Sequence, residues 1–187
     1  MNHSLLKRCC ATAAVAALAL VVAATAAAST VTATATVNAG TLTLATSASP
    51  SVSVTLDGTD QTPTYTLPMT VNDATGSGTG WNTTITSTTF TTGGGSPHLL
   101  SNSASTVTGV SSSCATGTCT NPTNAITYPL AVPAGGTAPT AVKLFNAAAN
   151  SGMGKFAVTP TVQVAIPANT YAGTYTSTVT VAVVSGP

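Results

Sequence analysis

Apolar and polar residues alternate along most of the chain, with Val, Leu, Ile or Ala at every second position and Thr or Ser between them. A period of two is typical of strands that bury one face, and both valine and threonine favour extended structure. No strand-like segment is followed by a helix-length periodic segment, so a parallel α/β sheet is not expected. We predict an all-β fold, an antiparallel β-sandwich (Ig-like or jelly-roll-like) of about nine or ten short strands. The expected strands are 29–37, 41–45, 51–56, 65–71, 85–90, 107–110, 125–132, 141–145, 155–166 and 174–184.

Prolines and turn residues mark the places where this alternation breaks. Pro63 and Pro68 make the segment 65–71 an edge or bulged strand, because proline cannot donate to a ladder of backbone hydrogen bonds. Pro160 predicts a bulge in its own strand for the same reason. The stretch 92–124 alternates least, and we expect it to be the least regular region of the domain.

A glycine-rich turn leads into Trp81, the only tryptophan of the protein. Three glycines at alternate positions before it can adopt positive φ or let another backbone approach closely. As a core residue, Trp81 would fill a gap under this loop, with its indole N–H bonded to a carbonyl. As a surface residue, Trp81 would stack on a sugar ring or, with its neighbours Gly80 and Asn82, contact a partner. The core interpretation is favoured, and the surface contact remains a candidate.

The first 28 residues have the organisation of a secretory signal peptide. Lys7 and Arg8 precede a run of small and apolar residues, which ends in A-x-A cleavage patterns. An uncleaved membrane anchor is the alternative, but no cluster of charges follows the run. We predict a signal peptide over 1–28, one β-sandwich domain over 29–187, a secreted or cell-surface location, and no membrane span after cleavage.

Charge is scarce, since charged residues make up only 4% of the chain. Outside the leader, two lysines stand against three aspartates, so the net charge there is 2 − 3 = −1. A nucleic-acid-binding protein needs a basic surface that releases counterions from the phosphate backbone. The composition therefore excludes nucleic acid as the expected partner.

Cys114 and Cys119 are the two cysteines outside the leader. In a secreted chain they meet an oxidising compartment, so we predict a structural disulfide between them. A redox or metal-binding pair is the alternative. Redox motifs usually separate their cysteines by two residues, and no histidine or further cysteine lies nearby in the sequence.

The acidic and histidine side chains outside the leader give no catalytic pattern. Asp57, Asp60 and Asp73 lie in two short loops that could hold calcium if they met, but Asx turns are the expected role. Hydrolysis of glycosides would need a raised carboxyl pKa and a cleft lined by aromatic residues. His98 has no nucleophile motif beside it and is expected in an exposed loop. We predict no enzyme activity, no cofactor and no metal site.

The loop around Trp81 resembles the first tryptophan motif of the WxL-type surface domains of bacteria. The matching residues are Val71-Asn72-Asp73, the glycines that follow, and Gly80-Trp81-Asn82-Thr83. The closing segment from Tyr171 to Pro187 is similar to the final strand of that family. Thr83 stands where the motif has leucine, and the second tryptophan motif is absent around Thr180. The resemblance implies an extracellular β-sandwich that binds the cell wall non-covalently.

Three functional hypotheses follow from these observations. The leading one is a non-enzymatic, exported surface protein whose partners are a cell-wall polymer or other surface proteins. The second is a homo-oligomer, a fibre or pilus subunit that adds the strand 30–37 to the sheet edge of a neighbouring copy. The third is a secreted carbohydrate-acting enzyme, and a secreted carbohydrate-binding module is a further alternative.

Overall fold

A computed structural model describes residues 28–46 and 49–187 of the chain. The predicted signal peptide, apart from its last residue, lies outside the described residues. The described residues form ten strands and no helix, and hence no helix that could cross a membrane. The strands are β1 (Leu42–Thr46), β2 (Thr64–Thr66), β3 (Met69–Asp73), β4 (Trp81–Thr88), β5 (Ser105–Thr120), β6 (Leu130–Ala131), β7 (Ala134–Gly135), β8 (Val142–Ala147), β9 (Met153–Val164) and β10 (Val179–Ser185).

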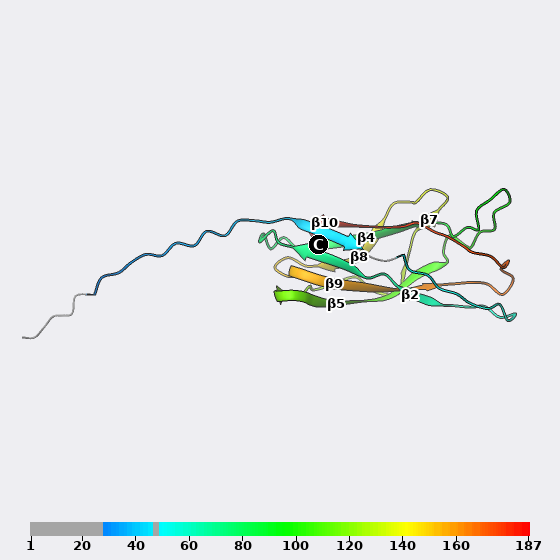
Figure 1. The fold of residues 1–187 in the computed structure, drawn as a ribbon, viewed down its shortest axis with the longest axis horizontal. Helices are drawn as coiled ribbons and strands as arrows, with labels where there is room; N and C mark the ends of the chain where they lie inside the picture. The colour runs from blue at the N-terminus through cyan, green and yellow to red at the C-terminus, as the bar shows by residue number, and fades with distance from the viewer. Residues whose placement is uncertain (1–27, 47–48) are drawn as a thin grey trace, which may run out of the picture. The chain divides into compact units, whose positions relative to one another are not determined.

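The strands form two sheets that pack as a sandwich, which confirms the predicted fold class (Figure 1). The first sheet has the order β1-β3-β9-β5-β6, and β2 also pairs with β9. The second has the order β10-β4-β7, and β8 pairs with β4. All neighbours are antiparallel except β4 and β7, which run parallel over two residue pairs.

The core lies between the two sheets and follows the alternation of the sequence. In β3 and along most of β9, every second side chain is buried, including Val71, Phe156 and Val158. The facing sheet contributes Ile85 and Leu144, which are almost completely buried. Full burial of one such side chain stabilises the fold by about 1.5–3 kcal/mol.

The segment 65–71 is interrupted as its prolines predict. Leu67 and Pro68 separate β2 from β3, and both strands pair with β9. The N–H of Leu67 donates to the carbonyl of Pro160 at this break. On the other side of β9, the register with β5 shifts between Val107 and Gly109, close to the proline. The extra residue at this shift is Thr108 of β5, and β9 itself runs past Pro160 without one, so the predicted bulge in the strand of Pro160 is wrong and the bulge lies in its neighbour.

The stretch predicted to be least regular contains the longest strand, and that prediction is wrong. β5 has 16 residues, and its second half is exposed on both faces. Polar residues on both faces produce no alternation, so the hydrophobic pattern could not indicate a strand. Backbone pairing with β9 along most of its length holds β5 extended.

Two predicted strands do not form, although their sequences alternate. Residues 29–37 have no regular structure and are exposed, with Val31 at 90% and Val37 at 94%. Residues 51–56 are also exposed and form no strand. A strand requires backbone hydrogen bonds to a neighbour, and among the described residues neither segment makes them. Of the predicted strand 125–132, only β6 is observed.

Candidate functional site

Trp81 is the centre of the main core, which confirms the core interpretation. Its side chain has no exposed surface, and its indole N–H donates to the carbonyl of Gly152 at 2.8 Å. The rings of Phe145 and Phe156 lie 5.8 and 6.4 Å from it in tilted arrangements. Tilted aromatic pairs of this kind add about 0.5–1.5 kcal/mol each to the energy of burial.

Two glycines make the space in which the indole fits. A Cβ on Gly152 would lie 2.7 Å from the indole nitrogen of Trp81, and Gly152 has φ +70°. A Cβ on Gly80, which has φ +74°, would collide with the carbonyl of Ala147. Both positions therefore need glycine for two reasons, the close approach and the left-handed backbone.

The loop between β3 and Trp81 is held together by its own hydroxyl groups. Asp73 accepts hydrogen bonds from the N–H and the hydroxyl of Thr75, which forms the expected Asx turn. The hydroxyls of Thr75, Ser77 and Thr79 are then linked in series at 2.9 and 3.0 Å. The last of them reaches Ser185 of β10 at 3.2 Å. The loop thereby joins the ends of two strands from different sheets.

Thr83, the residue that replaces the leucine of the WxL motif, is completely buried. Its hydroxyl donates to the carbonyl of Phe145 at 3.3 Å, so the polar atom has a partner inside the core. Asn82 is also buried and donates to the carbonyl of Gly186 at 2.8 Å. With Gly80 and Trp81 buried as well, the three candidate contact residues offer almost no surface to a partner. Direct contact of these three residues with the cell wall stays a prediction, and their burial does not support it.

Cys114 and Cys119 form the predicted disulfide, with 5.9 Å between their Cα atoms. The bond lies within β5, at the place where the register with β9 shifts twice. The strand bulges there around Gly117, which has φ +70°. Cys119 also packs against the main core and against Gly154. The disulfide therefore fixes an irregular, exposed length of strand to the end of the sandwich that holds Trp81.

The remaining polar candidates have structural partners. Asp57 accepts hydrogen bonds from the hydroxyl and the N–H of Thr59 in a second Asx turn. These bonds, led by the one from the hydroxyl, lower the pKa of Asp57. Asp60 accepts a hydrogen bond from the N–H of Ala168. Among the described residues, no group of three potential metal ligands comes together.

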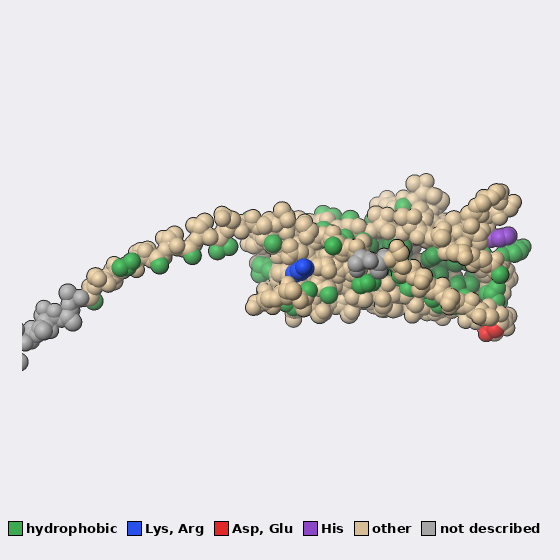
Figure 2. All heavy atoms as spheres, in the orientation of Figure 1, with side chains coloured by type: hydrophobic (Ala, Val, Ile, Leu, Met, Phe, Trp, Pro, Cys, Tyr) green, Lys and Arg blue, Asp and Glu red, His purple; other side chains and the backbone are tan. Residues whose placement is uncertain are grey.

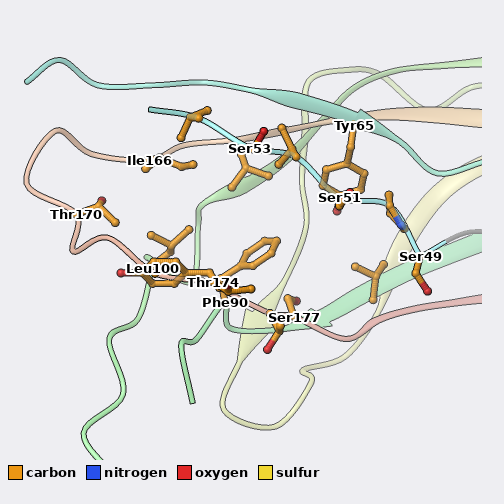
Figure 3. A pocket seen from close by; sticks show the side chains of 18 of the residues that line it. Ser49, Ser51, Ser53, Tyr65, Phe90, Leu100, Ile166, Thr170, Thr174 and Ser177 are labelled. Atoms are coloured by element: carbon orange, nitrogen blue, oxygen red, sulfur yellow. The ribbon is translucent and has the colours of Figure 1, made fainter. Parts of the chain in front are cut away.

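The opposite end of the sandwich is hollow. A pocket of about 960 Å³ lies between the sheets, where Val179 of β10 pairs with Ser87. Its walls include a second, smaller core cluster and the segment 49–56, which makes no backbone hydrogen bond to the other described residues (Figure 3). The lining includes four aromatic side chains: Tyr65, Phe90, Tyr171 and Tyr175. Burial raises the pKa of Tyr65.

An exposed aromatic pair stands at the mouth of this pocket. The rings of His98 and Tyr171 stack with centroids 3.8 Å apart and an angle of 12°. Tyr171 is 65% exposed, although it is one of the largest apolar side chains of the domain. The hydroxyl of Tyr175 donates to the carbonyl of Tyr171 and holds its backbone in place. Figure 2 shows hydrophobic side chains gathered around a hollow at this end, near the histidine.

The lining of the pocket, over the residues that the structure describes, consists of apolar, aromatic and hydroxyl side chains, with no carboxylate, imidazole or amine among them. The sequence does not indicate this pocket, because its aromatic residues are spread over more than a hundred positions, from Tyr65 to Tyr175. The tyrosine pair in the closing segment, Tyr171 and Tyr175, is a local signal but does not by itself predict a pocket. We define the end around Trp81 as the closed end and the end around the pocket as the open end.

A sequence model of the WxL domain family, described as a surface cell wall-binding domain, matches residues 23–187. The chain therefore belongs to this family, as the resemblance around Trp81 predicted. The match begins within the last residues of the predicted signal peptide. Neither a curated protein nor a solved structure matches the chain significantly.

Proposed function

We propose that this member of the WxL family is an exported, non-enzymatic structural protein that attaches non-covalently to the cell wall. The family match over residues 23–187 is the observation that carries the proposal, since the family is a surface cell wall-binding one. An apolar and hydroxyl-rich pocket without acid, base or amine groups is consistent with binding alone. The internal disulfide is consistent with an oxidising, extracellular location.

Sedimentation with isolated bacterial cell walls tests this function. The purified protein without residues 1–28 is expected to sediment with the walls and to be released by detergent at its unmodified mass. Release of sugar reducing ends into the supernatant is expected to stay at background. Complete recovery in the supernatant would exclude wall binding, and a wall-derived mass increase would exclude non-covalent attachment.

A fibre subunit is the second candidate, supported by the state of residues 29–37. This segment alternates apolar and hydroxyl residues, is exposed and has no strand partner among the described residues. Beyond Val107, the strand β5 has β9 as its one strand partner among the described residues, so its other edge offers backbone groups to a further strand. Electron microscopy should then show filaments that disappear when residues 29–37 are deleted. Monomers alone, over a wide concentration range, would exclude this candidate.

A further inference from the structure

The open end of the sandwich carries the features of a ligand site, and the closed end does not. At the closed end, the residues of the tryptophan motif are buried and their polar groups are hydrogen-bonded within the fold. At the open end, a pocket large enough for several sugar units lies beside an exposed aromatic ring. We infer that the open end binds an uncharged glycan chain of the wall, with Tyr171 stacking on one sugar ring. This inference rests on the proposed wall-binding function and assigns that binding to the open end of the sandwich.

The shape of the aromatic surface supports a sugar ligand. A pyranose ring presents an apolar face of C–H groups and an edge of hydroxyls, so it packs flat against an aromatic ring. His98 covers one face of Tyr171 at 3.8 Å, which leaves the other face and the edge to account for the 65% exposure. Stacking on His98 orients the ring before any ligand arrives, and the bond from Tyr175 holds the backbone of Tyr171. A preorganised ring loses little conformational entropy on binding.

Hydroxyl side chains supply the polar half of the site. Ser51, Ser53, Thr170 and Thr174 line the pocket, as Figure 3 shows. Within the described part of the chain, none of these four side chains makes a hydrogen bond to protein. They are therefore available to the hydroxyl and acetamido groups of a sugar, as expected of a mostly apolar pocket with a few polar groups.

The charge distribution selects a neutral ligand over a phosphate-bearing one. Among the described residues, no charged side chain lines the pocket. Asp57 and Asp60 lie near this end, in the loop beside Gln61, which pairs with Ile166 of the pocket wall. Lys143 and Lys155 pair with Thr84 and Asn72, toward the closed end. A polyanion would therefore approach an end of the sandwich that carries aspartates and, over its described residues, no lysine.

The test compares Tyr171→Ala with Leu99→Ala on two probes. Leu99 is the matched control, because it is 62% exposed at the same end and does not line the pocket. The probes are cell walls stripped of phosphate polymers by acid extraction, and a soluble β-1,4-linked oligomer of N-acetylglucosamine. Tyr171→Ala should weaken binding to both about tenfold, and Leu99→Ala should leave it unchanged. Equal unfolding midpoints for the three proteins would show that the fold is intact.

The outcomes separate this site from the proposed function. If the native protein binds walls and Tyr171→Ala binds them equally well, the site is wrong and the function stands. If the native protein binds the oligomer through Tyr171 but not the walls, the site stands and wall attachment is wrong. Binding that disappears with the phosphate polymers, or that a peptide of residues 29–37 displaces while Tyr171→Ala has no effect, would overturn the glycan site.

Discussion

The two ends of the sandwich use aromatic residues in opposite ways. At the closed end, Trp81, Phe145 and Phe156 form a tilted cluster whose only polar atom, the indole nitrogen, is bonded to a backbone carbonyl. At the open end, four aromatic side chains surround a pocket, and Tyr171 is largely exposed. The same strands connect both ends, since β10 pairs with Trp81 at one end and with Ser87 at the other.

This difference indicates that the two ends of the sandwich contribute differently to stability and to binding. Glycines at the closed end bring backbone into contact with the indole, and a disulfide secures the neighbouring strand. The open end has a smaller core cluster and a covering segment, residues 49–56, for which the described part of the chain supplies no backbone hydrogen bond. We expect the closed end to contribute most of the stability and the open end to tolerate substitution, as binding sites commonly do.

The largest effect is expected for Trp81→Ala. Loss of the buried indole leaves a cavity and an unpaired carbonyl at Gly152, so the free energy of unfolding should fall by about 3–5 kcal/mol. The counterpart at the open end is Tyr171→Ala, which should change it by less than about 0.5 kcal/mol because the ring is exposed. Urea unfolding followed by circular dichroism measures both. Similar losses for the two variants would remove the distinction between the ends.

Gly152→Ala tests the close packing of the closed end. The added methyl group would press on the indole in a backbone conformation that alanine disfavours, for a loss of about 2–4 kcal/mol in unfolding free energy. Gly93→Ala is the matched control at φ +69°, because no atom lies within 4 Å of the added carbon. Its loss should be about 1–2 kcal/mol, from the backbone alone. Equal losses would mean that contact with Trp81 adds nothing.

Replacing Cys114 and Cys119 together with serine measures the covalent contribution to the closed end. The disulfide joins cysteines five positions apart, and its removal should lower the unfolding free energy by about 2 kcal/mol in the chain-entropy model. Reducing agent should destabilise the native protein by the same amount and leave the double variant unaffected. Sensitivity of the double variant to reductant would contradict this assignment.

The smallest effect is expected from two tyrosines at high pH. Burial raises the pKa of both Tyr65, at the open end, and Tyr128, which packs against the main core. The stabilisation linked to each is complete below the usual tyrosine pKa, near 10, and is lost as the pH rises through the higher folded-state value. Phenylalanine at either position should therefore reduce the alkaline loss of stability.

At neutral pH the same two substitutions should differ. Tyr128 donates a hydrogen bond to the carbonyl of Leu144 at 2.7 Å, so Tyr128→Phe should cost about 1 kcal/mol. Tyr65→Phe should be nearly neutral, since among the described residues its hydroxyl makes no hydrogen bond to protein. Thermal melts at pH 7 and above pH 10 separate the effects. A larger neutral-pH loss for Tyr65→Phe would reverse the ranking of the two ends.

The elements of the fold that the sequence predicts are those with one buried face. β3, β9 and β10 alternate strictly, and burial at every second position produced that pattern. β5 could not be predicted, because an exposed strand with polar residues on both faces is held by its neighbour's backbone. Residues 51–56 were predicted as a strand that does not form. Their apolar and polar residues alternate, but the segment lines a pocket and joins neither sheet.

The candidate site divides in the same way. The disulfide was predictable, because Cys114 and Cys119 are the two cysteines outside the leader and lie only five positions apart. The burial of Trp81 was predictable from the glycines before it. The pocket was not, because Tyr65 and Tyr171 are brought together only by the pairing of distant strands around β9 and β10. No local sequence pattern indicates that Tyr65 and Tyr171 line the same pocket.

The pairing of β4 with β10 also has a consequence for how the chain folds. The bond from Asn82 to Gly186 closes a separation of 104 positions, and β9 finds partners only across long intervening segments. Domains dominated by such distant contacts fold slowly, in milliseconds to seconds. A chain with so few charges would then spend this interval with open strand edges. We expect its yield to depend on how dilute it is while it folds, with self-association rising steeply with concentration.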